Sequence, residues 1–255
     1  VYKRQIIVLI EKDDIPKYLL FLENAFPYMD NYNYHKGMNG IIQELKVLLK
    51  TKSIGTNSDR ALLLDFQATL ETKPEKAIKL EKDALAQIEN ITADNARLVS
   101  NLHANLGGLY RMNGHPDLAR EHMEKSISLL DQFNLLHIND SIPQIANYAM
   151  FLTEQQEPER GISELQKLSG IIKEYHSDDC LDYAKVQETL GTIYLMTANL
   201  PQAKTHFKRA FKIYEKIWAD EPEMIEAKYQ EIQELYPQIG FSIGKTLSGL
   251  LTKQT

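Results

Sequence analysis

Apolar side chains recur every three or four residues along most of the chain, a spacing that predicts amphipathic α-helices. Residues 15–29 and 32–50 show this period and predict one helix pair in an N-terminal region, 6–57. The stretch 51–58, which contains a glycine, is expected to form a loop. The N-terminal part of the chain is therefore predicted to be helical.

The same spacing continues near the C-terminus. Residues 220–222, Asp-Glu-Pro, are typical of a helix start, and residues 224–235 carry the apolar stripe of the helix that follows. Pro237 is expected to end it, and residues 239–251 are expected to form a short capping helix. We therefore assign residues 226–255 to a C-terminal cap.

Between these flanks, one pattern of residues is copied four times. Three prolines stand 42 residues apart and a fourth follows after 43, at Pro74, Pro116, Pro158 and Pro201. Each is expected at the start of a second helix, where its missing N–H costs nothing. Self-similarity at a fixed period predicts a repeat protein. The four units are 58–99, 100–141, 142–183 and 184–225.

Small residues recur at equivalent places in the units, where two antiparallel helices would have to approach closely. The first helices carry Gly107, Ala149 and Gly191, and the second helices carry Ala77, Ala119, Gly161, Ala203, Ala84, Ser126 and Ala210. Tyr110, Tyr194, Met123 and Phe207 are expected to fill the space around them. The first unit departs most, with Asp65 at the small position and Glu81 at the large one.

These spacings resemble the tetratricopeptide repeat (TPR). The second unit reads Leu106-Gly107-x-x-Tyr110 and Ala119-x-x-x-Met123, and the fourth reads Leu190-Gly191-x-x-Tyr194 and Ala203-x-x-x-Phe207. The period also overlaps that of HEAT and armadillo repeats, which lack this pairing. The resemblance implies an all-α fold, a right-handed superhelical solenoid of antiparallel helix pairs. A 42-residue period looks like the kinesin light chain type of repeat.

Composition narrows the class of protein. The 255 residues are 43% hydrophobic, which is enough for a sizeable core, and the net charge of −6 gives no general attraction to nucleic acid or anionic membranes. One cysteine, Cys180, excludes an intramolecular disulfide and suits a reducing compartment. No apolar run approaches the length of a membrane span. We expect a cytoplasmic protein that binds neither nucleic acid nor membrane.

The chain opens with Val1-Tyr2-Lys3-Arg4-Gln5, which is not a natural start. These residues resemble the translation of a transposon-end adapter, so residues 1–5 are expected to be an artefact fused to a truncated gene. The alternative is a boundary chosen for expression. The first alternative predicts that a larger N-terminal region belongs to this protein.

No motif in the sequence is a strong candidate for a catalytic, nucleotide-binding or metal-binding site. Residues 240–246, Gly-Phe-Ser-Ile-Gly-Lys-Thr, have three residues between the glycines where a P-loop needs four. His115 and His122 lie seven residues apart with no third residue at ligand spacing. Surface or helix-cap roles, not metal binding, are expected for these two and for the predicted loop residues His176, Asp178, Asp179 and Cys180. No catalytic constellation is visible. The sequence predicts no enzyme activity, no cofactor and no metal.

Basic residues form an i, i+4 series in the fourth unit, at Lys204, Lys208, Lys212 and Lys216, with Arg209 beside it. Such a series can bind nucleic acid. Neighbouring Glu215 and the lack of regular aromatic residues favour a solvated helix face instead.

The TPR resemblance implies a concave groove, lined by the first helix of each pair, that binds peptide segments. Its predicted lining is Asn101, Asn105, Arg111, Met112, Asn147, Met150, Glu154, Lys185, Glu188 and Thr192. Asn105 and Asn147 are equivalent, and an asparagine there commonly holds the ligand backbone in peptide-binding TPR proteins. The alternative is that each asparagine bonds a neighbouring helix.

The resulting hypothesis is a protein-protein interaction module that binds a peptide or partner protein. It would be the sensor or scaffold part of a larger bacterial signalling protein, and residues 19–49 with the repeats after them loosely resemble the region behind the nucleotide-binding domain of NB-ARC-type ATPases. The alternative is a self-contained bacterial regulator whose groove binds a short signalling peptide.

Overall fold

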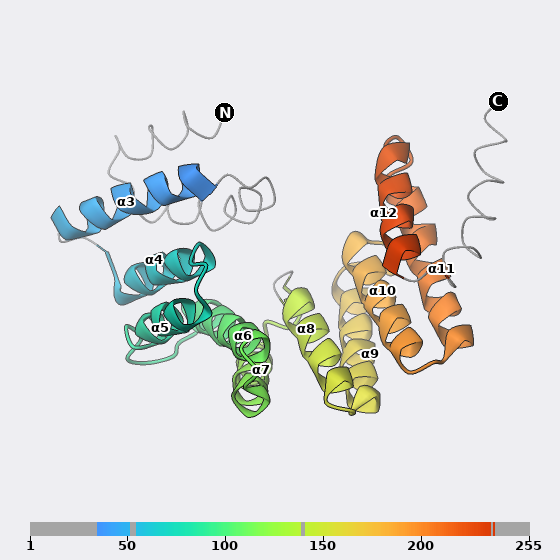
Figure 1. The fold of residues 1–255 in the computed structure, drawn as a ribbon, viewed down its shortest axis with the longest axis horizontal. Helices are drawn as coiled ribbons and strands as arrows, with labels where there is room; N and C mark the ends of the chain where they lie inside the picture. The colour runs from blue at the N-terminus through green and yellow to red at the C-terminus, as the bar shows by residue number, and fades with distance from the viewer. Residues whose placement is uncertain (1–34, 52–54, 139–140, 236, 238–255) are drawn as a thin grey trace. The chain divides into compact units, whose positions relative to one another are not determined.

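The computed structural model of the chain describes residues 35–51, 55–138, 141–235 and 237, and every regular element in them is an α-helix (Figure 1). In chain order the helices are α3 (His35–Thr51), α4 (Asn57–Thr69), α5 (Pro74–Leu85), α6 (Ala96–Met112), α7 (Pro116–Gln132), α8 (Ser141–Glu154), α9 (Pro158–Tyr175), α10 (Leu181–Met196), α11 (Leu200–Ile217) and α12 (Pro222–Leu235). The predicted helices at 15–29 and 239–251, the glycine motif at 240–246 and residues 1–5 lie outside the described residues.

The chain divides into two compact units, residues 1–133 (unit 1) and 134–255 (unit 2). In unit 1, α4 pairs with α5 and α6 with α7, and α3 packs on α4. In unit 2, α8 pairs with α9 and α10 with α11, and α12 packs on α11. Each of these four pairs contains one of the four repeated prolines.

The repeated prolines lie where the sequence predicts. Pro74, Pro116 and Pro158 begin α5, α7 and α9, and Pro201 is the second residue of α11. The predicted helix at 32–50 is α3, and the one at 224–235 is α12. The prediction of an all-α, TPR-like fold is confirmed.

Three of the four turns between paired helices contain a residue with left-handed backbone geometry. Gly114, Gln156 and Ala198, each 42 residues from the next, have φ of 74°, 65° and 59°. The residue after each one donates its N–H to a carbonyl five residues earlier, at 2.7 to 2.9 Å. This is the Schellman closure of a helix C-terminus, for which glycine is best suited. Three of the four repeats therefore turn in the same way.

Small residues set the separation of the paired helices. All of the small positions predicted from the sequence are buried. A Cβ on Gly107 would lie 2.6 Å from Cγ of Met123, and one on Gly161 would lie 2.6 Å from the carbonyl oxygen of Ala149. A larger side chain at either position would push the two helices apart.

The first repeat replaces this apolar contact with two carboxyl groups. Asp65 and Glu81 stand at the positions that Gly107 and Met123 occupy one repeat later. Glu81 is 2% exposed, and its Oε2 has no hydrogen-bond partner among the described residues. Burial, and then the charge of Asp65, raise the pKa of Glu81 to about 10. Glu81 is therefore protonated at neutral pH.

Helix α12 covers one end of the described part of unit 2. Its Ile232, 1% exposed, joins a core cluster with Phe207 and Phe211. Nζ of Lys228 lies 2.8 Å from Oε1 of Glu188, and both side chains are about one-fifth exposed. An apolar anchor and a half-buried ion pair therefore hold α12 on the repeat before it.

Candidate functional site

The predicted groove residues of unit 2, apart from Glu188, lie on one stripe of each first helix. On α8 this stripe has the spacing i, i+4, i+7, i+11 and comprises Pro143, Asn147, Met150 and Glu154 (the α8 stripe). The equivalent residues 42 positions later form the α10 stripe, which comprises Lys185, Thr189, Thr192 and Met196. Every member of both stripes is exposed or half-buried, and α8 packs against α10. Unit 2 therefore presents two equivalent, accessible helix faces.

The stripes mix polar and apolar side chains. Asn147 is exposed, and its side-chain amide forms no hydrogen bond with another described residue. Met196 is 47% exposed at one end of the α10 stripe. Both threonines of α10 donate their hydroxyls to carbonyls one turn earlier, Thr189 to Lys185 and Thr192 to Glu188. The asparagine amide is therefore the best placed group for bonding a ligand backbone.

Two predicted groove residues of α10 are engaged by unit 2 itself. Tyr214 donates its hydroxyl to Oε2 of Glu188 at 2.6 Å, in addition to the ion pair of Glu188 with Lys228. Burial, and then Glu188, raise the pKa of Tyr214, so its hydroxyl stays a donor. Lys185 lies 3.8 Å from Asp182 in an exposed ion pair. Glu188 therefore has a structural role, whereas Lys185 stays accessible.

In unit 1 the equivalent stripe on α6 comprises Asn101, Asn105, Gly108 and Met112. Asn101 and Arg111 are half-buried, and Met112 is 81% exposed. Asn105 is exposed, but its amide donates to Oδ1 of Asp65 on α4 at 2.8 Å. Asn105 therefore bonds a neighbouring helix, the alternative that the sequence left open, and peptide contact by this residue stays a prediction.

The stripe does not extend to the first repeat. The two central equivalent positions of α4 hold Leu63 and Phe66, which are 7% and 4% exposed. Their apolar side chains belong to the core of unit 1, and α3 packs on α4. The accessible stripes of the described residues are therefore those of α6, α8 and α10.

A stacked tyrosine and histidine join the paired helices of two repeats. Tyr110 stacks on His122 at 5.4 Å, and Tyr194 stacks on His206 at 5.3 Å. Nδ1 of His122 lies 2.9 Å from Nδ1 of His103, and Nδ1 of His206 lies 2.9 Å from Oε1 of Gln187. His103 and Gln187 are 84 residues apart, so the two contacts are equivalent.

The sequence gives no sign of the pair formed by His103 and His122, because the two lie on different helices, 19 residues apart. Burial, and then the charges of His122 and Lys125, lower the pKa of His103 to about 4. Burial also lowers the pKa of His122. Both rings are neutral at pH 7, and one donates to the other.

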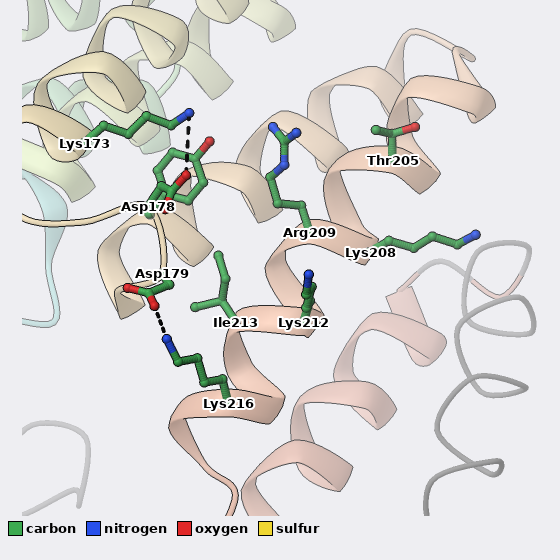
Figure 2. A pocket seen from close by; sticks show the side chains of 10 residues that line it. Lys173, Asp178, Asp179, Thr205, Lys208, Arg209, Lys212, Ile213 and Lys216 are labelled. Atoms are coloured by element: carbon green, nitrogen blue, oxygen red, sulfur yellow. Dashed lines mark hydrogen bonds and ion pairs between the residues drawn. The ribbon is translucent and has the colours of Figure 1, made fainter.

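The basic series of the fourth repeat lines a pocket (Figure 2). Its walls are the exposed face of α11, the C-terminal end of α9 and the α9–α10 loop. The pocket has a volume of about 660 Å³ and contains five basic and two acidic side chains. The sequence indicated a solvated helix face here. Lys208, Lys212 and Lys216 are indeed exposed, but the opposing residues that make the pocket, Lys173, Asp178 and Asp179, come from another repeat and were not anticipated.

Other candidate groups have local structural roles. Cys180 is the N-cap of α10, where its sulfur accepts from the N–H of Tyr183 at 3.5 Å. This is the helix-cap role expected for that segment. In the described part of the chain, no three metal-ligating side chains gather at one place. No described helix is both long and apolar enough to cross a membrane.

Part of the sequence matches a known protein family. Residues 141–216, which include both stripes of unit 2, match the tetratricopeptide repeat family. A comparison with curated protein sequences finds no match.

Solved structures are similar in fold to this chain over most of its length. BtubC (BKLC) from P. vanneervenii is similar with a TM-score of 0.63 and 16% identity, over 86% of this chain and 91% of that one. The TPR-like repeats of a Podosopora anserina protein assigned as a kinesin light chain are similar with a TM-score of 0.58 and 13% identity, over 77% and 96%. Residues 141–216 therefore match tetratricopeptide repeats in sequence, and the chain has the all-α fold of TPR solenoids.

Proposed function

We propose that this chain is a protein-interaction module that binds a peptide segment of a partner protein on the α8 and α10 stripes of unit 2. One observation carries the proposal. The residues that match the TPR family present two equivalent accessible stripes, and the amide of Asn147 on one of them has no hydrogen bond to any other described residue. TPR repeats generally mediate protein-protein interaction.

The chemistry of the stripes suits a backbone contact supported by apolar area. The Asn147 amide donates to a carbonyl and accepts from an N–H at once, which reads a peptide backbone without demanding a sequence. One such bond contributes only about 0.5–1.5 kcal/mol. Met150 and Met196 supply adaptable apolar surface on the two stripes, which is common on surfaces that accept varied partners.

The wider role that we propose is the sensor or scaffold part of a signalling protein in the cytoplasm. It is supported by the resemblance of the 42-residue spacing to the TPR arrays of such proteins. Reading the gene upstream of the codon for Ile6 tests this role. A coding region for a nucleotide-binding domain in the same frame supports it, and an authentic start codon near the codon for Ile6 contradicts it.

Selection from a random peptide library, followed by calorimetric titration of a selected peptide, tests the binding surface. We expect Asn147→Ala to weaken binding by about five- to tenfold, because the ligand loses a hydrogen bond of about 1 kcal/mol. Gln166→Ala is the matched control, since it removes an exposed amide from the second helix α9. Equal binding by wild type, Asn147→Ala and Met150→Ala would show that the peptide binds elsewhere.

A further inference from the structure

The basic pocket on α11 has more positive charge than the chain itself neutralises. Lys173 lies 3.9 Å from Asp178, and Lys216 is hydrogen-bonded to Asp179, as Figure 2 shows at one side of the pocket. Arg209 and Lys212 stand between these pairs and Thr205, and neither forms an ion pair with a described residue. Two cations of this pocket are therefore open to an external anion, and a third, Lys208, lies beside them.

The two acidic side chains are weakly held. Asp179 is exposed, and hydrogen bonds from Lys216 and Ser177 lower its pKa, so it is ionised at neutral pH. Exposed ion pairs of this kind contribute little to stability. A carboxylate from another chain can therefore replace Asp178 or Asp179 on its lysine at small cost.

The shape of the pocket favours an elongated occupant. Thr205, Arg209, Lys212 and Lys216 follow one another at i, i+4, i+7 and i+11 along a single face of α11. Eleven residues of α-helix span about 16 Å. One small anion would contact only one turn of this row. A chain with several spaced negative charges can contact all of it.

Two kinds of chain meet that description, an acidic peptide and a single-stranded nucleic acid. Nucleic acid binding without sequence preference combines a basic groove with aromatic rings on which bases stack. The only aromatic residue lining this pocket, Tyr183, is 3% exposed, and Nζ of Lys173 lies 5.2 Å from its ring centroid. The pocket therefore favours the peptide.

We propose that this pocket is a second interaction site, which binds an acidic segment of a partner protein through Arg209 and Lys212. Asp and Glu side chains of that segment pair with these two residues and displace Asp178 and Asp179 from Lys173 and Lys216. The α8 and α10 stripes take no part in this contact.

Fluorescence anisotropy with labelled decaglutamate tests the site, using the full chain at low salt. We expect the double variant Arg209→Gln/Lys212→Gln to bind about tenfold more weakly than wild type, since two charge pairs are lost. Binding to wild type should also weaken as sodium chloride rises from 20 to 200 mM. The control is Lys76→Gln/Lys79→Gln, which removes two exposed lysines from α5 in unit 1 and should bind as wild type does.

Three outcomes would overturn the proposal. The first is that wild type does not bind decaglutamate, and the second is that the two double variants lose affinity equally. The third is that labelled oligothymidine binds more tightly than decaglutamate, with the same dependence on Arg209 and Lys212. Both double variants change exposed side chains only, and circular dichroism verifies that they remain folded. Because the probe is a defined peptide, failure here leaves the result for the α8 and α10 stripes unaffected.

Discussion

The side-chain amide of Asn105 donates to Oδ1 of Asp65 at 2.8 Å and so joins the first helices of two successive repeats. Asp65 stands at a position where the neighbouring repeat has a glycine, and it lies against the buried Glu81. A residue that appeared suited to a ligand is therefore part of a polar contact inside unit 1.

We predict that Glu81→Gln stabilises unit 1 at neutral pH. The pKa of Glu81 is 4.5 when unperturbed and about 10 in the folded chain, so between these values the folded state holds one more proton than the unfolded state. The contribution of Glu81 to stability is then greatest below pH 4.5 and falls as the pH rises toward 10. Glutamine can still donate to Asp65 but has no proton to lose. We expect a gain of about 1–3 kcal/mol at pH 7 from urea unfolding followed by circular dichroism.

Glu44→Gln, an exposed change on α3, is the control and should leave the pH profile unchanged. A decline with pH that persists in Glu81→Gln would contradict the assignment. The only tryptophan, Trp218, lies in unit 2, so its fluorescence reports that unit separately.

Unit 1 should also lose stability in mild acid, because of His103. Its pKa is lowered to about 4, so between pH 6.5 and 4 the unfolded chain binds a proton that the folded chain does not. His103→Gln places in unit 1 the residue found at the equivalent position, Gln187, which bonds a histidine without titrating. We expect this variant to recover about 1 kcal/mol of the stability lost between pH 7 and pH 5, after allowance for the partial exposure of His103.

The measurement is the urea midpoint at the two pH values. His115→Gln, which replaces an exposed imidazole at the turn before α7, serves as the control. Identical acid sensitivity of His103→Gln and wild type would mean that His103 is not responsible.

A methyl group added to α9 should have opposite effects at two glycines. A Cβ at Gly161 would lie 2.6 Å from a backbone oxygen of α8, whereas one at Gly170 would meet nothing within 4 Å. We expect Gly161→Ala to destabilise unit 2 by about 2–3 kcal/mol through overpacking. Gly170→Ala should stabilise it by about 0.5–1 kcal/mol, because alanine has the higher helix propensity. Thermal unfolding followed by Trp218 fluorescence compares the two, and equal melting temperatures would refute the packing argument.

The left-handed turn residue of the fourth repeat offers a gain in stability. Ala198 has φ of 59°, a geometry that costs an L-residue about 1–2 kcal/mol relative to glycine. Ala198→Gly should therefore raise the melting temperature of unit 2. Ala227→Gly, in the exposed face of α12, should lower it. A loss of stability in both variants would show that the turn tolerates alanine without strain.

The sequence predicts the fold well because the repeat is marked by residues with small side chains and by prolines with a fixed backbone angle. Small residues such as Gly107 and Ala149 recur where two helices pack closely, and Pro116 marks the start of a helix. The positions of these residues in the sequence therefore predict the helix contacts. It predicts the sites less well. The histidine pair and the basic pocket depend on which residues of different helices meet, and Lys173 and Lys212 are 39 positions apart. Asn105 and Asn147 are equivalent in sequence, yet only the neighbour of Asn105 carries a carboxylate, Asp65.

The three left-handed turns at Gly114, Gln156 and Ala198 limit how the length of this chain can change. Each turn spans three residues between its helices, at 113–115, 155–157 and 197–199, and is closed by the same backbone bond. An inserted residue there would rotate the second helix by about 100° and turn its small residues away from their contacts. The connections between repeats have no such constraint, and two of them, 86–95 and 176–180, differ in length. Insertions and deletions in related chains should therefore accumulate between repeats, while the hairpin within each repeat keeps its length.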